Sequence, residues 1–241
     1  WDTLKLPVLV CCIAGATYIL GFLTMPTIIL FALITALTTI ALFIIEFFHG
    51  RQGEYLVVIN TIVFGIALLV SLFYLPSDGF ALYYYSLGHP VSYLLLIVGT
   101  IILYALSRFL KGKSGYTYPA VVIALSFLCI LVMAIAVPTL YQTFIDGLIT
   151  FFGLSPYAVT IQEARPWTLA EAWDVFNFGL ILMIGGAAIL LYKGWKEYRA
   201  EHIFVLVWSL FIIIAAFRQV RYEYYLAVNI ALLGGICVGY F

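Results

Sequence analysis

The chain has 241 residues, of which 66% are hydrophobic and only 9% are charged, and its formal net charge is zero. Such a composition cannot supply the polar shell of a water-soluble globular protein. The sequence therefore predicts an integral membrane protein. In a membrane protein a net charge of zero says nothing about nucleic acid, and no DNA or RNA partner is implied.

Apolar stretches of about 18 residues or more recur along the chain, and each can cross a hydrocarbon core of about 30 Å as a helix. They lack the period-two alternation of barrel strands. Prolines lie at the ends of the stretches, where a missing N–H is tolerated. The predicted fold class is an all-α polytopic bundle, with about eight transmembrane helices at roughly 6–24, 26–45, 55–74, 91–110, 118–137, 175–192, 203–217 and 222–241.

One long hydrophilic stretch, 139–174, separates the fifth span from the sixth. Within it, apolar residues at helical spacing predict a short interfacial helix over 141–152. Thr168 followed by Glu171 matches a capping box, which predicts a helix that starts at Thr168 and runs into the sixth span. The segment between these helices has no pattern that fixes its structure, and loops of this length are usually functional or disordered. We therefore expect the chemistry of the protein to be concentrated in this stretch.

Basic residues are divided unequally between the two sides of the predicted bundle. The side of the long loop has three of them, namely Arg165, Arg218 and Arg221. The side of the N-terminus has the other eight, namely Lys5, Arg51, Arg108, Lys111, Lys113, Lys193, Lys196 and Arg199. By the positive-inside rule, the N-terminal side is cytoplasmic and the long loop faces outward from the cell membrane. Arginines on the outward side, where basic residues are few, usually have an ionic partner or a functional role.

Two motifs give the chain a resemblance to a known family. The loop tetrapeptide Thr160-Ile161-Gln162-Glu163 resembles the Thr-Ile-x-Glu motif in the fifth external loop of archaeal oligosaccharyltransferases, the enzymes of asparagine-linked glycosylation. The segment 221–229, Arg-Tyr-Glu-Tyr-Tyr-Leu-Ala-Val-Asn, is similar to an Arg-aromatic-x-Tyr-Tyr-Leu-Ala-Val segment of the same family. The order of loop motif, two spans and arginine segment is more specific than either motif alone. The resemblance extends over essentially the whole chain.

The resemblance implies a bundle of the membrane glycosyltransferase C type, with thirteen helices followed by an external globular domain. The eight spans here would be helices five to twelve, and the first would then run outward, in agreement with the charge asymmetry. The chain starts at Trp1, ends within an apolar run and contains no Trp-Trp-Asp. We therefore expect a fragment that lacks two acidic motifs of earlier external loops and the domain that reads the acceptor sequon. Alone, such a fragment is expected to be inactive.

The activity implied by the resemblance is transfer of an oligosaccharide from a polyprenyl (dolichyl) phosphate or diphosphate carrier to asparagine in Asn-x-Ser/Thr sequons. The reaction would be metal-dependent and inverting. Its partners would be the lipid-linked oligosaccharide, the acceptor polypeptide and membrane lipids. The leaving phosphate accumulates negative charge, which a divalent cation and a guanidinium can stabilise. Hard oxygen ligands suit Mg²⁺ or Mn²⁺.

The resemblance also assigns roles to residues. Glu163 would be the catalytic carboxylate, placed near the metal and the acceptor amide. Arg221 would bind the lipid phosphate, because a planar guanidinium suits phosphate oxygens better than a lysine does. Arg218, on the same predicted helical face, could take that role instead. Without the resemblance, Glu163 is an ordinary solvated acid and Arg221 an arginine that snorkels to headgroups.

Three further residues have weaker signals. Arg165 and Trp167 are expected to anchor the loop. His89, next to Pro90 on the outward side, could approach the site, although a hydrogen-bonded interface histidine is the commoner case.

Other classes of function share this architecture. A secondary transporter would usually have ionisable or Gly/Pro-broken segments at the bilayer midplane, whereas the predicted spans are uninterrupted. A different polyprenyl-phosphate-dependent glycosyltransferase, for example one that mannosylates protein hydroxyls, would not require the Thr-Ile-x-Glu loop. A purely structural membrane subunit would leave the loop acid and Arg221 without a purpose.

Overall fold

The computed structural model describes residues 2–74, 79–152, 162–196 and 199–240, and every regular element in these ranges is a helix. The predicted all-α membrane fold is therefore confirmed. Among the described helices, seven are long and apolar enough to cross a membrane, or eight if a bent pair near residue 177 is one span. The chain divides into two compact units, 1–147 and 148–241, and each is described by itself.

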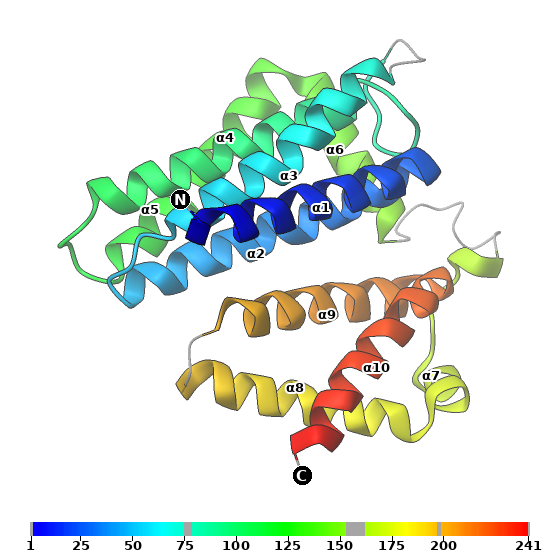
Figure 1. Cartoon of the computed structure of the whole chain (residues 1–241). Helices are drawn as coiled ribbons and strands as arrows, with labels where there is room; N and C mark the ends of the chain where they lie inside the picture. Colours follow the sequence, from blue (N-terminus) through cyan, green and yellow to red (C-terminus); the bar gives the residue numbers. More distant parts are fainter. Residues whose placement is uncertain (1, 75–78, 153–161, 197–198, 241) are drawn as a thin grey trace. The chain divides into compact units, whose positions relative to one another are not determined.

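The first unit is a helical bundle followed by two more peripheral helices (Figure 1). Its elements are α1 (Asp2–Thr24), η1 (Pro26–Ile28), α2 (Ile29–Phe48), α3 (Glu54–Phe73), α4 (Gly88–Phe109), α5 (Thr117–Ala136) and the start of α6 (Pro138–Phe151). The predicted short helix over 141–152 thus exists as α6. Pro7 lies within α1 because that helix begins at Asp2, so the expectation that prolines fall only at helix ends does not hold there.

Aromatic and polar side chains fix the core of the first unit. The hydroxyl groups of Tyr18 and Tyr93 lie 3.2 Å apart, and Tyr93 is fully buried. Deeper along the helices, the Asn60 amide donates to the hydroxyl of Thr39 at 2.9 Å and to that of Thr100 at 3.1 Å. These bonds join α2, α3 and α4, since a polar group inside an apolar bundle needs an internal partner.

The second unit carries the loop and the arginine segment. Its elements are the end of α6, η3 (Gln162–Ala164), α7 (Leu169–Phe176), α8 (Phe178–Lys196), α9 (Ala200–Arg218), η4 (Val220–Tyr222) and α10 (Glu223–Tyr240). Helices α8 and α10 pack closely (Figure 1). A Cβ at Gly185 would lie 2.7 Å from the Cys237 sulfur, and one at Gly186 would meet the backbone of Leu233. Glycine is therefore required for this approach.

The sixth span is interrupted where the sequence predicts continuity. The Thr168–Glu171 capping box is present, as predicted. However, α7 ends at Phe176, α8 begins at Phe178, and the two helices are bent by 97°. Asn177 between them has a positive φ of 45° with ψ −128°, a backbone conformation that residues with a Cβ rarely adopt. The predicted span 175–192 is wrong at its start because apolar residues continue across the break and conceal it.

Candidate functional site

The two motifs recognised in the sequence meet in the second unit. Glu163 lies in η3 and Arg221 in η4, and these two short helices pack against each other. The backbone N–H of Val220 donates to the carbonyl oxygen of Arg165 at 3.0 Å. Just beyond, the N–H of Trp167 donates to the carbonyl oxygen of Phe217 at 3.3 Å. The fold therefore pins the loop motif to the turn that carries the arginine.

Trp167 anchors this junction with its side chain. The residue is only 4% exposed. Its ring centroid lies 5.8 Å from that of Phe176 in α7 and 5.8 Å from that of Phe217 in α9. A buried aromatic side chain of this size contributes strongly to packing. The predicted anchoring role of Trp167 agrees with these contacts.

Arg165 and the capping box hold the other end of the loop. The Arg165 guanidinium lies 2.7 Å from a Glu171 carboxylate oxygen. The other carboxylate oxygen accepts from the backbone N–H of Thr168 at 3.0 Å and from its hydroxyl at 2.9 Å. These two hydrogen bonds, followed by Arg165, hold the pKa of Glu171 below its usual value. Glu171 therefore serves the loop's structure, as does Arg165.

Glu163 presents an exposed carboxylate on η3. Thr160 and Ile161 lie outside the described residues, and for Gln162 only the backbone is described. Glu163 is therefore the one member of the tetrapeptide whose side chain the structure describes. Its backbone is fixed by the neighbouring Arg165 and Trp167 hydrogen bonds, while its carboxylate faces outward from the packed junction.

Arg221 is exposed but held in a defined place. Its guanidinium donates to the hydroxyl of Tyr222 at 3.3 Å, and its Cζ atom lies 5.1 Å from the centroid of the same ring. Tyr222 is itself only 8% exposed, so it forms a fixed support beneath the cation. In the part of the chain that the structure describes, no ion pair joins Arg221 to Glu163. A guanidinium has five N–H donors, and this one can offer several to an anion.

Arg218 does not share a helical face with Arg221, contrary to the prediction. Arg218 is the last residue of α9, and Gln219 follows in an extended conformation with φ −147° and ψ 124°. The helix is therefore broken between the two arginines. Both remain exposed on the same short turn, so Arg218 stays a candidate for phosphate contact by proximity in the chain alone.

Gln219 and Tyr222 were not anticipated as parts of the site. Gln219 is 1% exposed, and its amide donates to the carbonyl oxygen of Thr150 in α6 at 2.7 Å. It thereby fixes the arginine turn to the end of α6. Tyr222 occupies the aromatic position of the recognised segment, which is the signal that could have revealed it. Gln219 carries no comparable signal, because a glutamine between two arginines usually points to solvent.

The described residues do not by themselves complete a metal site. No group of three His, Cys, Asp or Glu side chains gathers among them. Glu163 offers one carboxylate, whereas Mg²⁺ requires about six ligands in near-octahedral geometry. A divalent ion at Glu163 would therefore need donors from elsewhere.

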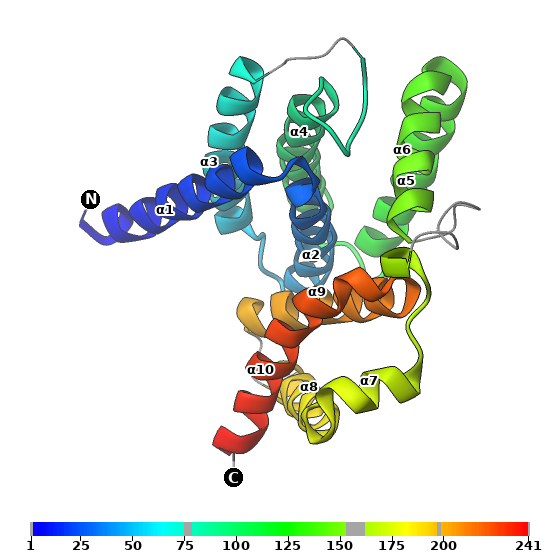
Figure 2. The ribbon, with the colours of Figure 1, turned by 90° about the vertical axis from the view of Figure 1, so that its right-hand side faces the viewer.

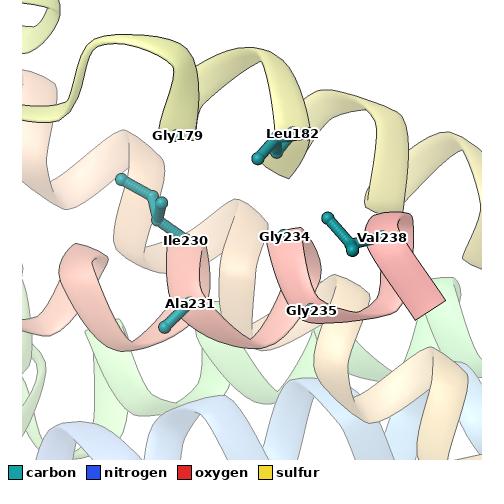
Figure 3. A pocket seen from close by; sticks show the side chains of 7 residues that line it. All are labelled: Gly179, Leu182, Ile230, Ala231, Gly234, Gly235 and Val238. Atoms are coloured by element: carbon teal, nitrogen blue, oxygen red, sulfur yellow. The ribbon is translucent and has the colours of Figure 1, made fainter.

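The surroundings of two other features argue against a role in the candidate site. His89 is fully buried in the first unit, and its Nε2 donates to the carbonyl oxygen of Pro26 at 2.9 Å, so it ties α4 to η1. An open pocket with a volume of about 430 Å³ lies between α8 and α10. Figure 3 shows the residues that line it. The residues that line it have no polar side chain; they are Gly179, Leu182, Ile230, Ala231, Gly234, Gly235 and Val238. Such a lining offers no side chain for acid, base or phosphate chemistry.

The fold of the chain is that of part of the solved archaeal oligosaccharyltransferases. Over 96% of its length the chain matches the oligosaccharyltransferase AglB from Archaeoglobus fulgidus, solved in complex with an inhibitory peptide and a dolichol-phosphate, with a TM-score of 0.85 and 21% identity. The same enzyme, tethered to an acceptor peptide containing the NVT sequon, matches with a TM-score of 0.76 and 22% identity, again over 96% of this chain.

Sequence comparison gives the same result. The chain is 23% identical to the dolichyl-monophosphooligosaccharide–protein glycotransferase AglB of Haloferax volcanii, over 96% of this chain. No protein-family profile matches the chain. The chain spans 29% of the Haloferax protein, and 28% and 27% of the two Archaeoglobus chains. The resemblance predicted from the two motifs is confirmed, and the chain is a homologue of part of these multi-pass membrane enzymes.

Proposed function

We propose that this chain is the part of an oligosaccharyltransferase that holds the carrier phosphate and presents the loop carboxylate. The whole enzyme would transfer an oligosaccharide from a dolichyl phosphate or diphosphate to asparagine in Asn-x-Ser/Thr. This proposal is supported by the Haloferax homologue, whose name describes glycosyl transfer from a dolichyl-monophosphate-linked oligosaccharide to protein. It is further supported by the Archaeoglobus structures that contain a dolichol-phosphate or an NVT acceptor peptide.

The observation that carries the proposal is the pinning of η3 to η4. A carboxylate and a guanidinium from distant parts of the chain are brought to one packed junction, yet no ion pair joins them in the described part. Two opposite charges that lie on neighbouring short helices, and that do not pair with each other in the described part, can both interact with a third group. A substrate with an anionic leaving group and an N–H nucleophile has the complementary chemistry.

Arg221 would bind and neutralise the phosphate of the carrier. As the sugar–phosphate bond breaks, negative charge accumulates on the phosphate oxygens, and a guanidinium already in place stabilises that charge. Such a preorganised donor contributes roughly 3 to 4 kcal/mol in other enzymes. The Tyr222 ring and hydroxyl fix the guanidinium before substrate arrives, which lowers the cost of ordering a long side chain.

Glu163 would act on the acceptor. Its carboxylate oxygens can accept hydrogen bonds from the two N–H groups of an asparagine amide and so orient the nitrogen toward the sugar carbon. In an inverting reaction the nitrogen attacks from the face opposite the phosphate, and Glu163 and Arg221 would serve those two opposite positions.

A divalent cation, Mn²⁺ or Mg²⁺, would supply further stabilisation of the phosphate charge when bound. Glu163 would be one of its oxygen ligands, with the other ligands coming from parts of the enzyme beyond this chain. We accordingly propose that this chain alone neither holds the metal tightly nor catalyses transfer.

The proposed orientation places the N-terminal side in the cytoplasm and 139–174 outside. Single cysteines at Lys113 and Lys196 should then react only with membrane-permeant reagents in right-side-out vesicles, and one at Ala158 with impermeant reagents. Ala158 lies outside the described residues.

The activity itself is tested by incubating the longer enzyme with lipid-linked oligosaccharide and a peptide that contains an Asn-x-Thr sequon. Mass spectrometry should show a glycan on asparagine and none on a matched Gln-x-Thr peptide. A glycan on the hydroxyl of the Gln-x-Thr peptide would instead identify a glycosyltransferase that acts on protein hydroxyl groups.

A further inference from the structure

Helix α7 has an apolar face that the rest of its unit leaves uncovered. Leu169 is 73% exposed and Trp173 is 42% exposed. These residues lie one turn apart, at positions i and i+4, and so form one continuous strip. An exposed leucine or tryptophan alone is unremarkable, but an exposed pair on one helix face marks an interaction surface.

The remaining residues of α7 lie either on a side that packs against the protein or on a polar side. Ala172 is 1% exposed, and Phe176 packs against Trp167, so that side rests on the protein. Glu171 and Asp174 occupy the polar side. The helix is therefore amphipathic, with one apolar flank seated on the protein and the flank of Leu169 and Trp173 open.

The geometry of α7 excludes a membrane crossing. Eight residues span about 12 Å, less than half of a hydrocarbon core. The helix is bent by 97° from α8, and Asn177 provides the break. Figure 2 shows α8 almost end-on while α7 runs across the view. If α8 crosses the bilayer, α7 must run roughly parallel to the bilayer surface.

The open strip is continuous with the exposed apolar surface of α8. The Trp173 ring lies 5.8 Å from that of Phe178, the first residue of α8. Phe178 is 71% exposed and Ile181 is 53% exposed. In a helix that crosses the bilayer, such side chains face lipid. If α8 crosses the bilayer, lipid reaches Phe178, and the Trp173 strip begins where that surface ends.

We propose that α7 is an interfacial anchor, with Leu169 and Trp173 inserted at the boundary between headgroups and hydrocarbon. Tryptophan favours this layer because its ring is apolar and its N–H is polar. The anchor has a consequence for the loop. Because α7 is joined to the loop by its capping box and by the Arg165–Glu171 ion pair, its depth in the membrane sets the depth of the Glu163 segment. This inference does not depend on the proposed enzymatic activity.

Spin labels can test the anchor in the full-length protein. Cys11, Cys12, Cys129 and Cys237 are first replaced by alanine or serine, and single cysteines are placed at Leu169 and Trp173, with matched positions Ala170 and Asp174. The protein is reconstituted in nanodiscs of phosphatidylcholine and phosphatidylglycerol. Accessibility to oxygen and to a water-soluble nickel complex is measured by power saturation. Labels at 169 and 173 should favour oxygen, and those at 170 and 174 should favour nickel.

Three patterns would overturn the proposal. Nickel accessibility at all four sites would place α7 in water, and oxygen accessibility at all four would place it inside the hydrocarbon. Low accessibility to both reagents at 169 and 173 would show that another part of the protein covers the strip. A second comparison uses the label at 169: Trp173→Asp should shift it toward nickel, whereas Trp173→Leu should not. An equal response to both variants would also contradict the anchor.

Discussion

The backbone N–H of Val220 donates a 3.0 Å hydrogen bond to the carbonyl oxygen of Arg165. Arg165 lies two residues after Glu163, just past the end of η3. Val220 directly precedes Arg221 in η4. The bond is between main-chain atoms, so its geometry is insensitive to many side-chain changes nearby. It explains how two motifs separated by the three helices α7, α8 and α9 are held side by side.

The first prediction concerns Arg221 in the complete enzyme. Arg221→Ala removes the guanidinium and should reduce the rate of transfer by roughly a hundredfold, the scale of one aimed donor in an active site. Arg221→Lys keeps the charge but loses the planar fork, so it should show an intermediate loss. Initial rates of peptide glycosylation provide the measurement. Arg218→Ala should lose less, and equal rates for Arg221→Ala and wild type would leave Arg221 only a snorkelling role.

The second prediction concerns the tie between Gln219 and α6. Gln219→Leu removes the donor to the Thr150 carbonyl and places an apolar side chain in a buried polar position. Loss of a buried hydrogen bond costs about 1 to 3 kcal/mol, so the midpoint of thermal unfolding should fall. Transfer should fall as well, because η4 loses one of its fixed points. Gln142→Leu, at an exposed position in α6, is the matched control and should change neither quantity appreciably.

The third prediction concerns pH and the capping box. The pKa of Glu171 is depressed in the folded protein, so the carboxylate stabilises the start of α7 at pH values above its ordinary pKa. That contribution is lost as the pH falls through the depressed value. A spin label at Ala170 should therefore become more mobile only in buffer more acidic than the ordinary pKa of a glutamate, and not in mildly acidic buffer. Glu171→Gln can still accept from the Thr168 N–H, so it should remove the pH dependence and keep the cap. Persistent pH dependence in that variant would assign the effect to another group.

The fourth prediction concerns the contact between α8 and α10. A methyl group at Gly186 would meet the Leu233 main chain, where no flexible side chain can yield. Gly186→Ala should therefore destabilise the fold by about 1 to 3 kcal/mol, as overpacking does. Gly235→Ala is the control on α10, since its new Cβ would have nothing within 4 Å. Thermal unfolding in detergent should show a lower midpoint for Gly186→Ala alone; equal midpoints would mean that the helices can separate without cost.

Much of the fold could be predicted because its causes are local. Runs of apolar residues define the spans, and Thr168 with Glu171 defines a helix start that the structure reproduces. The break at Asn177 escaped prediction, since apolar residues lie on both sides of it and hydropathy has no signal for a backbone dihedral. The extended Gln219, which separates Arg218 from Arg221, escaped for a similar reason. Its conformation is accompanied by a tertiary bond to Thr150, and no local pattern encodes that partner.

The candidate site could also be predicted only in part from the sequence. Glu163 and Arg221 were found through motifs, and their segments are indeed packed together. What the motifs could not reveal is how the segments are joined, because main-chain hydrogen bonds such as that of Val220 leave no trace in residue type. The role of Tyr222 could be predicted only in part. The motif shows that an aromatic residue occupies this position. Only the structure shows that the ring supports the Arg221 guanidinium, whose Cζ atom lies 5.1 Å from the ring centroid.

The central claim is that Glu163 is a working carboxylate rather than a solvated loop acid. Glu163→Gln preserves size and polarity but replaces an acceptor oxygen with an NH₂ donor and removes the charge that a metal ligand needs. Glu201→Gln, at an exposed acid in α9, is the matched control. The deciding measurement is the initial rate of peptide glycosylation by the complete enzyme at limiting Mn²⁺, with thermal unfolding checked in parallel. We predict a loss of roughly a hundredfold or more in Glu163→Gln with unchanged unfolding, and no loss in Glu201→Gln. A wild-type rate in Glu163→Gln under these conditions would contradict the account.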